Sequence, residues 1–261
     1  MHGVSFSSQT GENNMPSRIV RAAFDRGQLP TIACINAAKT PLGVDLGKLV
    51  AALQNFVDNC FAPVWGIPAK LVVASKPVKG CWALVFLDNA DTPGALGYHD
   101  LTPDGLPLAK IFVETTLKDN QKVSVTACHE LAEMLLDPAI NLWSDGPKNS
   151  EYAYEACDAV EEIEFKIDGI SMSDFVYPAY FEVFRKPGST QFDYCKKVSK
   201  PFQVLSGGYS LVRKGTAVKQ IYGSKAKAKR FRREDRRLHR TEYRKALLAG
   251  KPMLQRTHVK A

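Results

Sequence analysis

The chain has 261 residues, of which 45% are hydrophobic, so it holds enough apolar material for one sizeable domain with an extension or for two small domains. No run approaches the eighteen apolar residues of a transmembrane helix, and the N-terminus lacks the basic and apolar regions of a secretory signal. We therefore expect a protein that is made and kept in a cytosol, or packed into a particle assembled there, with no membrane partner.

The net charge of +8 hides a sharp division along the chain. Residues 224–261 contain fourteen Lys and Arg against three Asp and Glu, which gives this segment a charge of +11. Residues 129–182 contain thirteen acidic residues and two lysines, a local charge of −11. The sequence therefore predicts an acidic centre and a separable basic C-terminal tail.

The first half of the chain predicts strands around one helix. Residues 1–28 are polar at first and predict a loosely tethered arm, whereas residues 44–61 have apolar positions at helical spacing. The expected strands are residues 29–36, 69–75 and 82–87, and then a hairpin of 97–101 with 106–114 around Thr102-Pro103-Asp104-Gly105.

A second helix is expected over residues 124–137, because Val123, Ala127, Leu131 and Leu135 repeat like a core-facing stripe and Pro138 disfavours continuation. A loop over 141–150 should follow. The expected hairpins are 165–167 with 170–172 and 202–205 with 209–212, and the tail should be helical over 225–248. This order indicates an α+β domain over 29–223, between the arm and a basic helical tail over 224–261.

The most informative stretch is His129-Glu130-Leu131-Ala132-Glu133, followed one turn later by Asp137. On a helix, His129, Glu133 and Asp137 share one face, with Glu130 beside them. Three carboxylates then crowd together with no Lys or Arg, toward the helix end where the macrodipole disfavours negative charge. A solvated helix face would normally mix Lys with Glu. A bound cation is the simplest explanation, and H-E-x-x-E differs by one residue from the H-E-x-x-H of zinc peptidases.

Metal-dependent hydrolysis needs a few ligands, an open position for water and a carboxylate base beside that water. His129 and Glu133 are the expected ligands, and Glu130 is the candidate base. The further ligand would come from Glu155 or Asp158, which lie three residues apart downstream. Asp137 is either a direct ligand or a residue that supports one. So many oxygen ligands admit Ca²⁺ or another hard divalent ion as well as Zn²⁺.

One histidine and two cysteines outside the motif are further candidates for metal binding. His99 could reach the site, although a buried histidine with structural partners is the commoner case. Cys128 and Cys157 flank the candidate ligands, but the six cysteines form no C-x-x-C pair, and tetrahedral thiolate sites usually show closer pairing. We therefore expect free thiols that act as small hydrophobic residues.

Four blocks of the chain resemble zincin-type proteins that are frequent in bacteriophage and prophage genomes. They begin at His129, Glu155, Ser173 and Pro201, and read HELAEMLLDP, EACD, SDFVYPAYF and PFQVLSGGY. The resemblance covers about residues 100–215. It implies a zincin fold with an edge strand ahead of the active-site helix, which residues 106–114 would match, and which in peptidases pairs with extended substrate. The chain departs from well-studied zincins at Glu133, where they have His.

Two functions remain open at this point. The first is a metal-dependent peptidase of phage or prophage origin, acting on a peptide or protein. The second is a non-enzymatic virion component that uses a metal-stapled zincin scaffold. In either case residues 225–245 would place positive charge around a helix, which suits nucleic acid, an acidic protein surface or other virion subunits.

Overall fold

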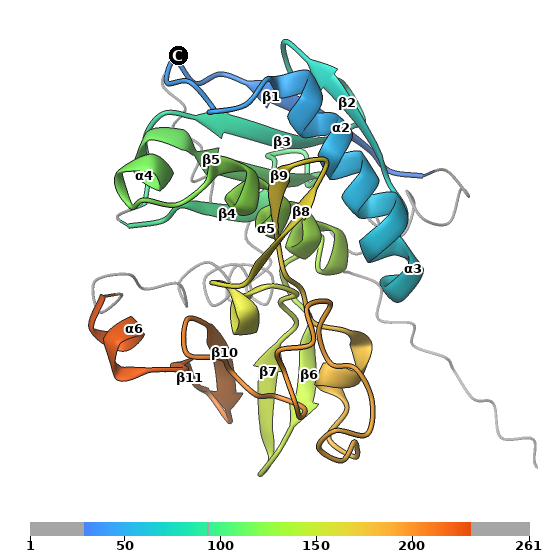
Figure 1. Ribbon diagram of the computed structural model, residues 1–261, viewed down its shortest axis with the longest axis vertical. Coiled ribbons are helices and arrows are strands. Elements are labelled where there is room, and N and C mark those ends of the chain that lie inside the picture. The colour runs from blue at the N-terminus through green and yellow to red at the C-terminus, as the bar shows by residue number, and fades with distance from the viewer. Residues whose placement is uncertain (1–28, 93, 231–261) are drawn as a thin grey trace, which may run out of the picture.

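The computed structural model describes residues 29–92 and 94–230, and it confirms the expected α+β class (Figure 1). The N-terminal arm and the tail beyond α6 (Lys225–Arg230) lie outside the described residues. A mixed sheet with two long helical segments and a small hairpin forms one part of the molecule, and the other part contains a four-stranded antiparallel sheet. No helix in the described ranges is long and apolar enough to cross a membrane.

The larger sheet has five strands in the order β2-β1-β3-β5-β4. The strands are β1 (Thr31–Asn36), β2 (Lys70–Ala74), β3 (Trp82–Leu87), β4 (Gly97–Leu101) and β5 (Pro107–Phe112). Strand β4 alone runs antiparallel to its neighbour, and the other pairs are parallel. The expectation that residues 106–114 form the edge strand was wrong. Strand β5 is flanked by β3 and β4, so β4 is the edge, and β5 ends where α4 (Val113–Lys118) begins.

Two helical segments pack against this sheet and share one core. The first runs through α2 (Leu46–Phe56), a π-helical turn (Val57–Phe61) and α3 (Ala62–Trp65), so it ends four residues later than expected. The Asp45 carboxylate caps its start by accepting a hydrogen bond from the backbone N–H of Lys48. The second segment is α5 (Val123–Leu136), which contacts β4 and β5 and spans nearly the expected residues.

The rest of the chain forms two antiparallel sheets: a hairpin that packs on α5 and α2, and a four-stranded sheet that lies below α5 in Figure 1. The expected hairpin around Asp168-Gly169 is confirmed as β8 (Glu164–Ile167) and β9 (Ile170–Ser173). The other sheet has the order β11-β10-β7-β6. Its strands are β6 (Trp143–Gly146), β7 (Ser150–Ala153), β10 (Tyr209–Lys214) and β11 (Ala217–Tyr222).

Two sequence expectations were wrong in this region. Residues 141–150 form a hairpin rather than a loop, because Lys148 and Asn149 both take the left-handed conformation that a tight turn between β6 and β7 requires. Residues 202–205 are not a strand, and β10 pairs instead with β7 and β11. A second core made largely of aromatic and branched side chains, including Tyr180, Phe181 and Phe192, fills this part.

Candidate metal centre

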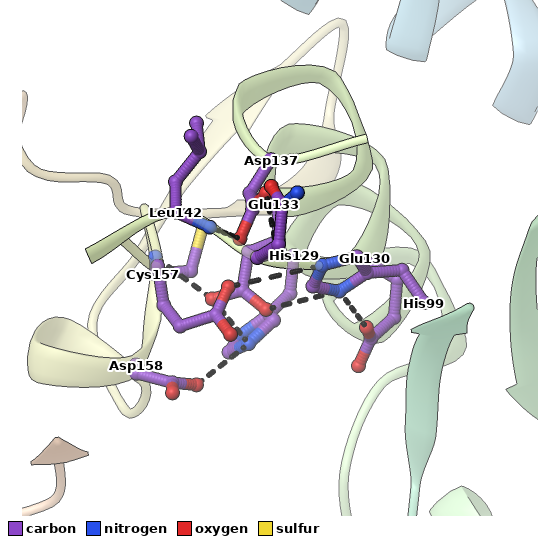
Figure 2. Close-up of polar contacts among 10 residues, drawn as sticks. His99, His129, Glu130, Glu133, Asp137, Leu142, Cys157 and Asp158 are labelled. Carbon is purple, nitrogen blue, oxygen red and sulfur yellow. Dashed lines mark hydrogen bonds and ion pairs between the residues drawn. The ribbon is translucent and has the colours of Figure 1, made fainter. Parts of the chain in front are cut away.

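Helix α5 is held by its polar contacts to the β8–β9 hairpin as well as by its apolar stripe. The Ser124 hydroxyl donates a hydrogen bond to the backbone oxygen of Ser171 at 2.8 Å. Leu131 and the other residues of the predicted stripe are buried in the main core. His129 and Glu133, one turn apart, then meet side chains that come from β4 and from the short helical turn Asp158–Val160 (Figure 2).

The first cluster joins His129, Glu133 and Asp158. The His129 Nε2 atom lies 3.2 Å from Glu133 Oε1 and 3.3 Å from Asp158 Oδ1. His129 is 7% exposed, and the two carboxylates are each 4% exposed. Two atoms that each lie about 2.1 Å from a zinc ion are about 3.4 Å apart in tetrahedral geometry. The spacing within this cluster therefore suits a single cation.

The second cluster joins His99, Glu130 and Glu133. The His99 Nδ1 atom lies 3.8 Å from both Glu130 Oε2 and Glu133 Oε2. These separations exceed hydrogen-bond length, but they fall within the span that two ligands of one ion can have. His99 is 6% exposed. In both clusters one ligand atom from each residue can be chosen so that all lie within 4.8 Å of one another.

His99 is the site residue to which the sequence argument gave too little weight. It lies on β4, where side chains alternate between the two faces of the sheet. Tyr98 contacts Lys110 and Asp91, whereas His99 faces α5. The alternation was visible in the sequence. What was missing was the knowledge that β4 lies against α5.

Glu155 and Asp137, both predicted as possible ligands, take different positions. The Glu155 Oε2 atom lies 3.9 Å from His99 Nε2, at the margin of the second cluster. The oxygens of Asp137 instead accept hydrogen bonds from the backbone N–H groups of Asn141 and Leu142, at 3.0 and 3.1 Å. Asp137 thus holds the chain that leaves α5, and it belongs to neither cluster.

Backbone contacts position the two carboxylates of the first cluster. The backbone N–H of Cys157 donates a hydrogen bond to Glu133 Oε1 at 3.1 Å. The turn that carries Asp158 is held by a hydrogen bond from the N–H of Leu205 to the oxygen of Ala159. A side-chain carbon at Gly208 would lie 2.3 Å from that same oxygen, so only glycine permits this close approach.

The electrostatics of the site show an excess of negative charge. Burial by itself would lower the pKa of His129, but the carboxylates of Glu133 and Asp158 hold it well above its usual value. Burial likewise opposes the charged form of His99, yet Glu155 and the other nearby carboxylates raise its pKa to about 9. Burial and the Asp158 carboxylate raise the pKa of Glu133. Without a cation, these raised pKa values favour the protonated forms of His99, His129 and Glu133.

The cysteines near the site are buried and are not members of either cluster. Burial raises the pKa of both Cys128 and Cys157 far above that of an exposed thiol. All six cysteines of the chain are free. The ligand atoms that the site offers are therefore imidazole nitrogens and carboxylate oxygens, a set compatible with zinc and with harder divalent ions.

Comparisons of the chain with protein families, with curated proteins and with solved structures found no match. The class of site is thus defined by its geometry alone, as a buried group of histidines and carboxylates that could hold a metal ion.

Proposed function

We propose that this protein is a metal-dependent peptidase of the zincin type, from a phage or prophage. The observation that carries the proposal is the first cluster, in which the His129 imidazole and two carboxylates converge at 3.2 and 3.3 Å in a buried position. In this arrangement His129, Glu133 and Asp158 would hold the metal, and Glu130 lies beside them on the same helix.

The arrangement of the sheet supports the zincin assignment. The resemblance implies an edge strand ahead of the active-site helix, and β4 is an edge strand that precedes α5 and contacts it. An extended peptide could add to the free side of β4 by backbone hydrogen bonding. His99 on β4 lies 3.8 Å from the carboxylates of Glu130 and Glu133, so a peptide bound there would run beside the metal centre.

The chemistry follows from the positions of the side chains. A bound divalent cation would lower the pKa of a coordinated water to about 7 and polarise a peptide carbonyl. Glu130 would take the proton from that water and pass it to the leaving amine. The buried surroundings of Glu130, which is 7% exposed, would keep this carboxylate close to its reacting partners and away from bulk solvent.

Metal content and peptide cleavage test the proposal in separate steps. We expect the purified protein to contain stoichiometric zinc or another divalent metal by mass spectrometry, and His129→Ala to lose the ion held by the first cluster. We expect the parent to cleave members of a peptide library, and Glu130→Gln to cleave at least about 100-fold more slowly because it lacks the base. Absence of metal from the parent would overturn the metal site. Equal cleavage by the parent and Glu130→Gln would overturn the role of Glu130.

A second function, a non-enzymatic virion component, is favoured by the basic tail. The charge of +11 over residues 224–261 has no role in peptide hydrolysis but suits nucleic acid, an acidic protein surface or a neighbouring virion subunit. In that case the metal would stabilise the fold of a structural protein, and the parent protein would cleave no peptide. Removal of 224–261 should then weaken DNA binding and reduce its salt dependence, whereas unchanged affinity would exclude the nucleic-acid role.

A further inference from the structure

We infer that the site is built for two divalent cations, with the Glu133 carboxylate bridging them. One position is formed by His129 and Asp158, and the other by His99 and Glu130. The inference rests on the proposed metal centre and adds its stoichiometry and its second ligand set.

The two oxygens of Glu133 face different clusters. Oε1 lies 3.2 Å from His129 Nε2, whereas Oε2 lies 3.8 Å from His99 Nδ1. A carboxylate that offers one oxygen to each of two ions holds them about 3.5–4 Å apart, as in two-metal hydrolytic sites. Each position then has an imidazole, one oxygen of Glu133 and a carboxylate of its own, which is Asp158 in the first and Glu130 in the second.

One ion does not account for both imidazoles. Ligands of a single divalent ion lie within about 4.4 Å of one another, because each is about 2.0–2.2 Å from the metal. Among residues 29–92 and 94–230, each group of possible ligands that meets a 4.8 Å limit contains either His99 or His129, and none contains both. The two imidazoles therefore mark two positions rather than alternative ligands of one.

The balance of charge at the site also supports two divalent cations. Four carboxylates gather around the two histidines, and each side chain is at most 10% exposed. The ion pairs made by Glu130, Glu133 and Asp158 within the described residues are all with His99 or His129, and none is with Lys or Arg. Two divalent cations would neutralise four carboxylates while leaving both imidazoles neutral, as ligands must be. One cation would leave two buried negative charges to be balanced by protons.

Buried polar atoms without hydrogen bonds belong to one histidine and one carboxylate of the two positions. Asp158 Oδ1 is buried and makes no hydrogen bond in the described part of the chain, although it lies 3.3 Å from His129 Nε2. His99 Nε2 is likewise buried without a hydrogen bond and lies 3.9 Å from Glu155 Oε2, whereas the other ring nitrogen, Nδ1, faces Glu130 and Glu133. Polar atoms in such surroundings normally have a partner. Gly97 on β4 also brings the second position close to α5, because a side-chain carbon there would lie 2.8 Å from Glu130 Cγ.

A second cation would change the role of Glu130. With the first position filled, Glu130 is free to act as a base, whereas a cation at the second position would take its carboxylate as a ligand. Hydrolysis that depends on Glu130 should therefore fall as the second position fills. Peptide cleavage is then expected to rise and afterwards decline as metal is added.

The test is the number of ions bound by the full-length protein, measured by equilibrium dialysis and mass spectrometry with Zn²⁺ and with Mn²⁺ alone. We expect two ions in the parent, one in His99→Gln and one in Asp158→Asn, and loss of both from Glu133→Gln. Asp174→Asn is the matched control, because Asp174 is fully buried outside both clusters and burial raises its pKa. This control should still bind two ions.

Electron paramagnetic resonance of the Mn²⁺-loaded protein gives a readout of position. Two manganese ions about 4 Å apart should couple, so the signal of an isolated ion should weaken as the second position fills. Should His99→Gln not fold, as judged by circular dichroism, Glu130→Gln removes a ligand of the same position and should also bind one ion. One ion in the parent, or two ions in folded His99→Gln or Glu130→Gln, would overturn the second position while leaving the proposed peptidase intact. No ion in the parent would overturn both.

Discussion

The buried carboxylates of this protein fall into two regions that use the same chemical group differently. Asp137 and Asp193 are fully buried, and their oxygens accept hydrogen bonds from backbone N–H groups of nearby loops. Asp158 and Glu130 are also buried, but their ion pairs are with histidines. A carboxylate whose oxygens are taken by backbone donors holds the fold, whereas one that faces imidazoles is available to a cation.

This comparison predicts opposite outcomes for two aspartates that the sequence placed together as candidate ligands. Asp137 and Asp158 differ little in exposure, at 0% and 4%. Their partners, rather than their burial, distinguish them.

The largest effect is expected from Asp158→Asn on metal affinity. Loss of a charged ligand 3.3 Å from His129 Nε2 should weaken zinc binding at the first position by about 100-fold or more. The metal-free variant should unfold at a urea concentration equal to or above that of the parent, because one of several repelling carboxylates has been neutralised. Competition with a zinc chelator and urea unfolding measure the two quantities. Unchanged affinity would show that Asp158 belongs with the loop-holding aspartates.

Asp137→Ala should have the opposite pattern, with a large loss of stability and little change in zinc affinity. It leaves the N–H groups of Asn141 and Leu142 without their carboxylate acceptors, so we expect a loss of about 3 kcal/mol in the free energy of unfolding. Zinc affinity, measured at a temperature where the variant is folded, should change by less than about threefold. A large loss of affinity with normal stability would instead make Asp137 a ligand.

The pH dependence of the metal-free protein should reveal the protons that replace the cation. The pKa of His99 is about 9 in the folded protein against an ordinary value of 6.5. Its contribution to stability is therefore complete below pH 6.5 and is lost as the pH rises through 9. Glu133, whose pKa is also raised, contributes in the same direction.

We therefore expect chelator-treated protein to lose up to about 3 kcal/mol of unfolding free energy between pH 6.5 and 9. Zinc-loaded protein should not show this loss, because the cation takes the place of the protons. Urea unfolding at a series of pH values measures both. Parallel pH profiles with and without zinc would indicate that the histidines do not respond to the metal.

The smallest effect is expected from Gly208→Ala. The added carbon would meet the backbone oxygen of Ala159 at 2.3 Å and push the turn that carries Asp158. Zinc affinity should fall about tenfold, as for other residues that support a ligand. Gly169→Ala is the matched control, since its φ of +79° makes it costly by about 1 kcal/mol while nothing lies within 4 Å of the added carbon. Zinc affinity should be unchanged in this control.

The regular elements could be largely predicted from the sequence. The apolar stripe from Val123 to Leu135 and the following Pro138 predicted α5, and the alternation of strong turn residues with apolar runs predicted β3 and the β8–β9 hairpin. Residues 202–205 misled the prediction because the Gly207-Gly208 pair resembles a hairpin turn. Gly208 instead allows its own backbone to lie close to the turn that carries Asp158.

The sequence by itself determined the spacing of His129, Glu130 and Glu133, because helical periodicity is a local property and places residues four apart on one face. It also determined the surplus of carboxylates around them. Only the tertiary structure decided which partners complete the group. It brought His99 from the edge strand β4 and Asp158 from a turn 25 residues after Glu133, and it turned Asp137 toward backbone donors. Such pairings depend on how distant segments pack, a choice that no local periodicity encodes.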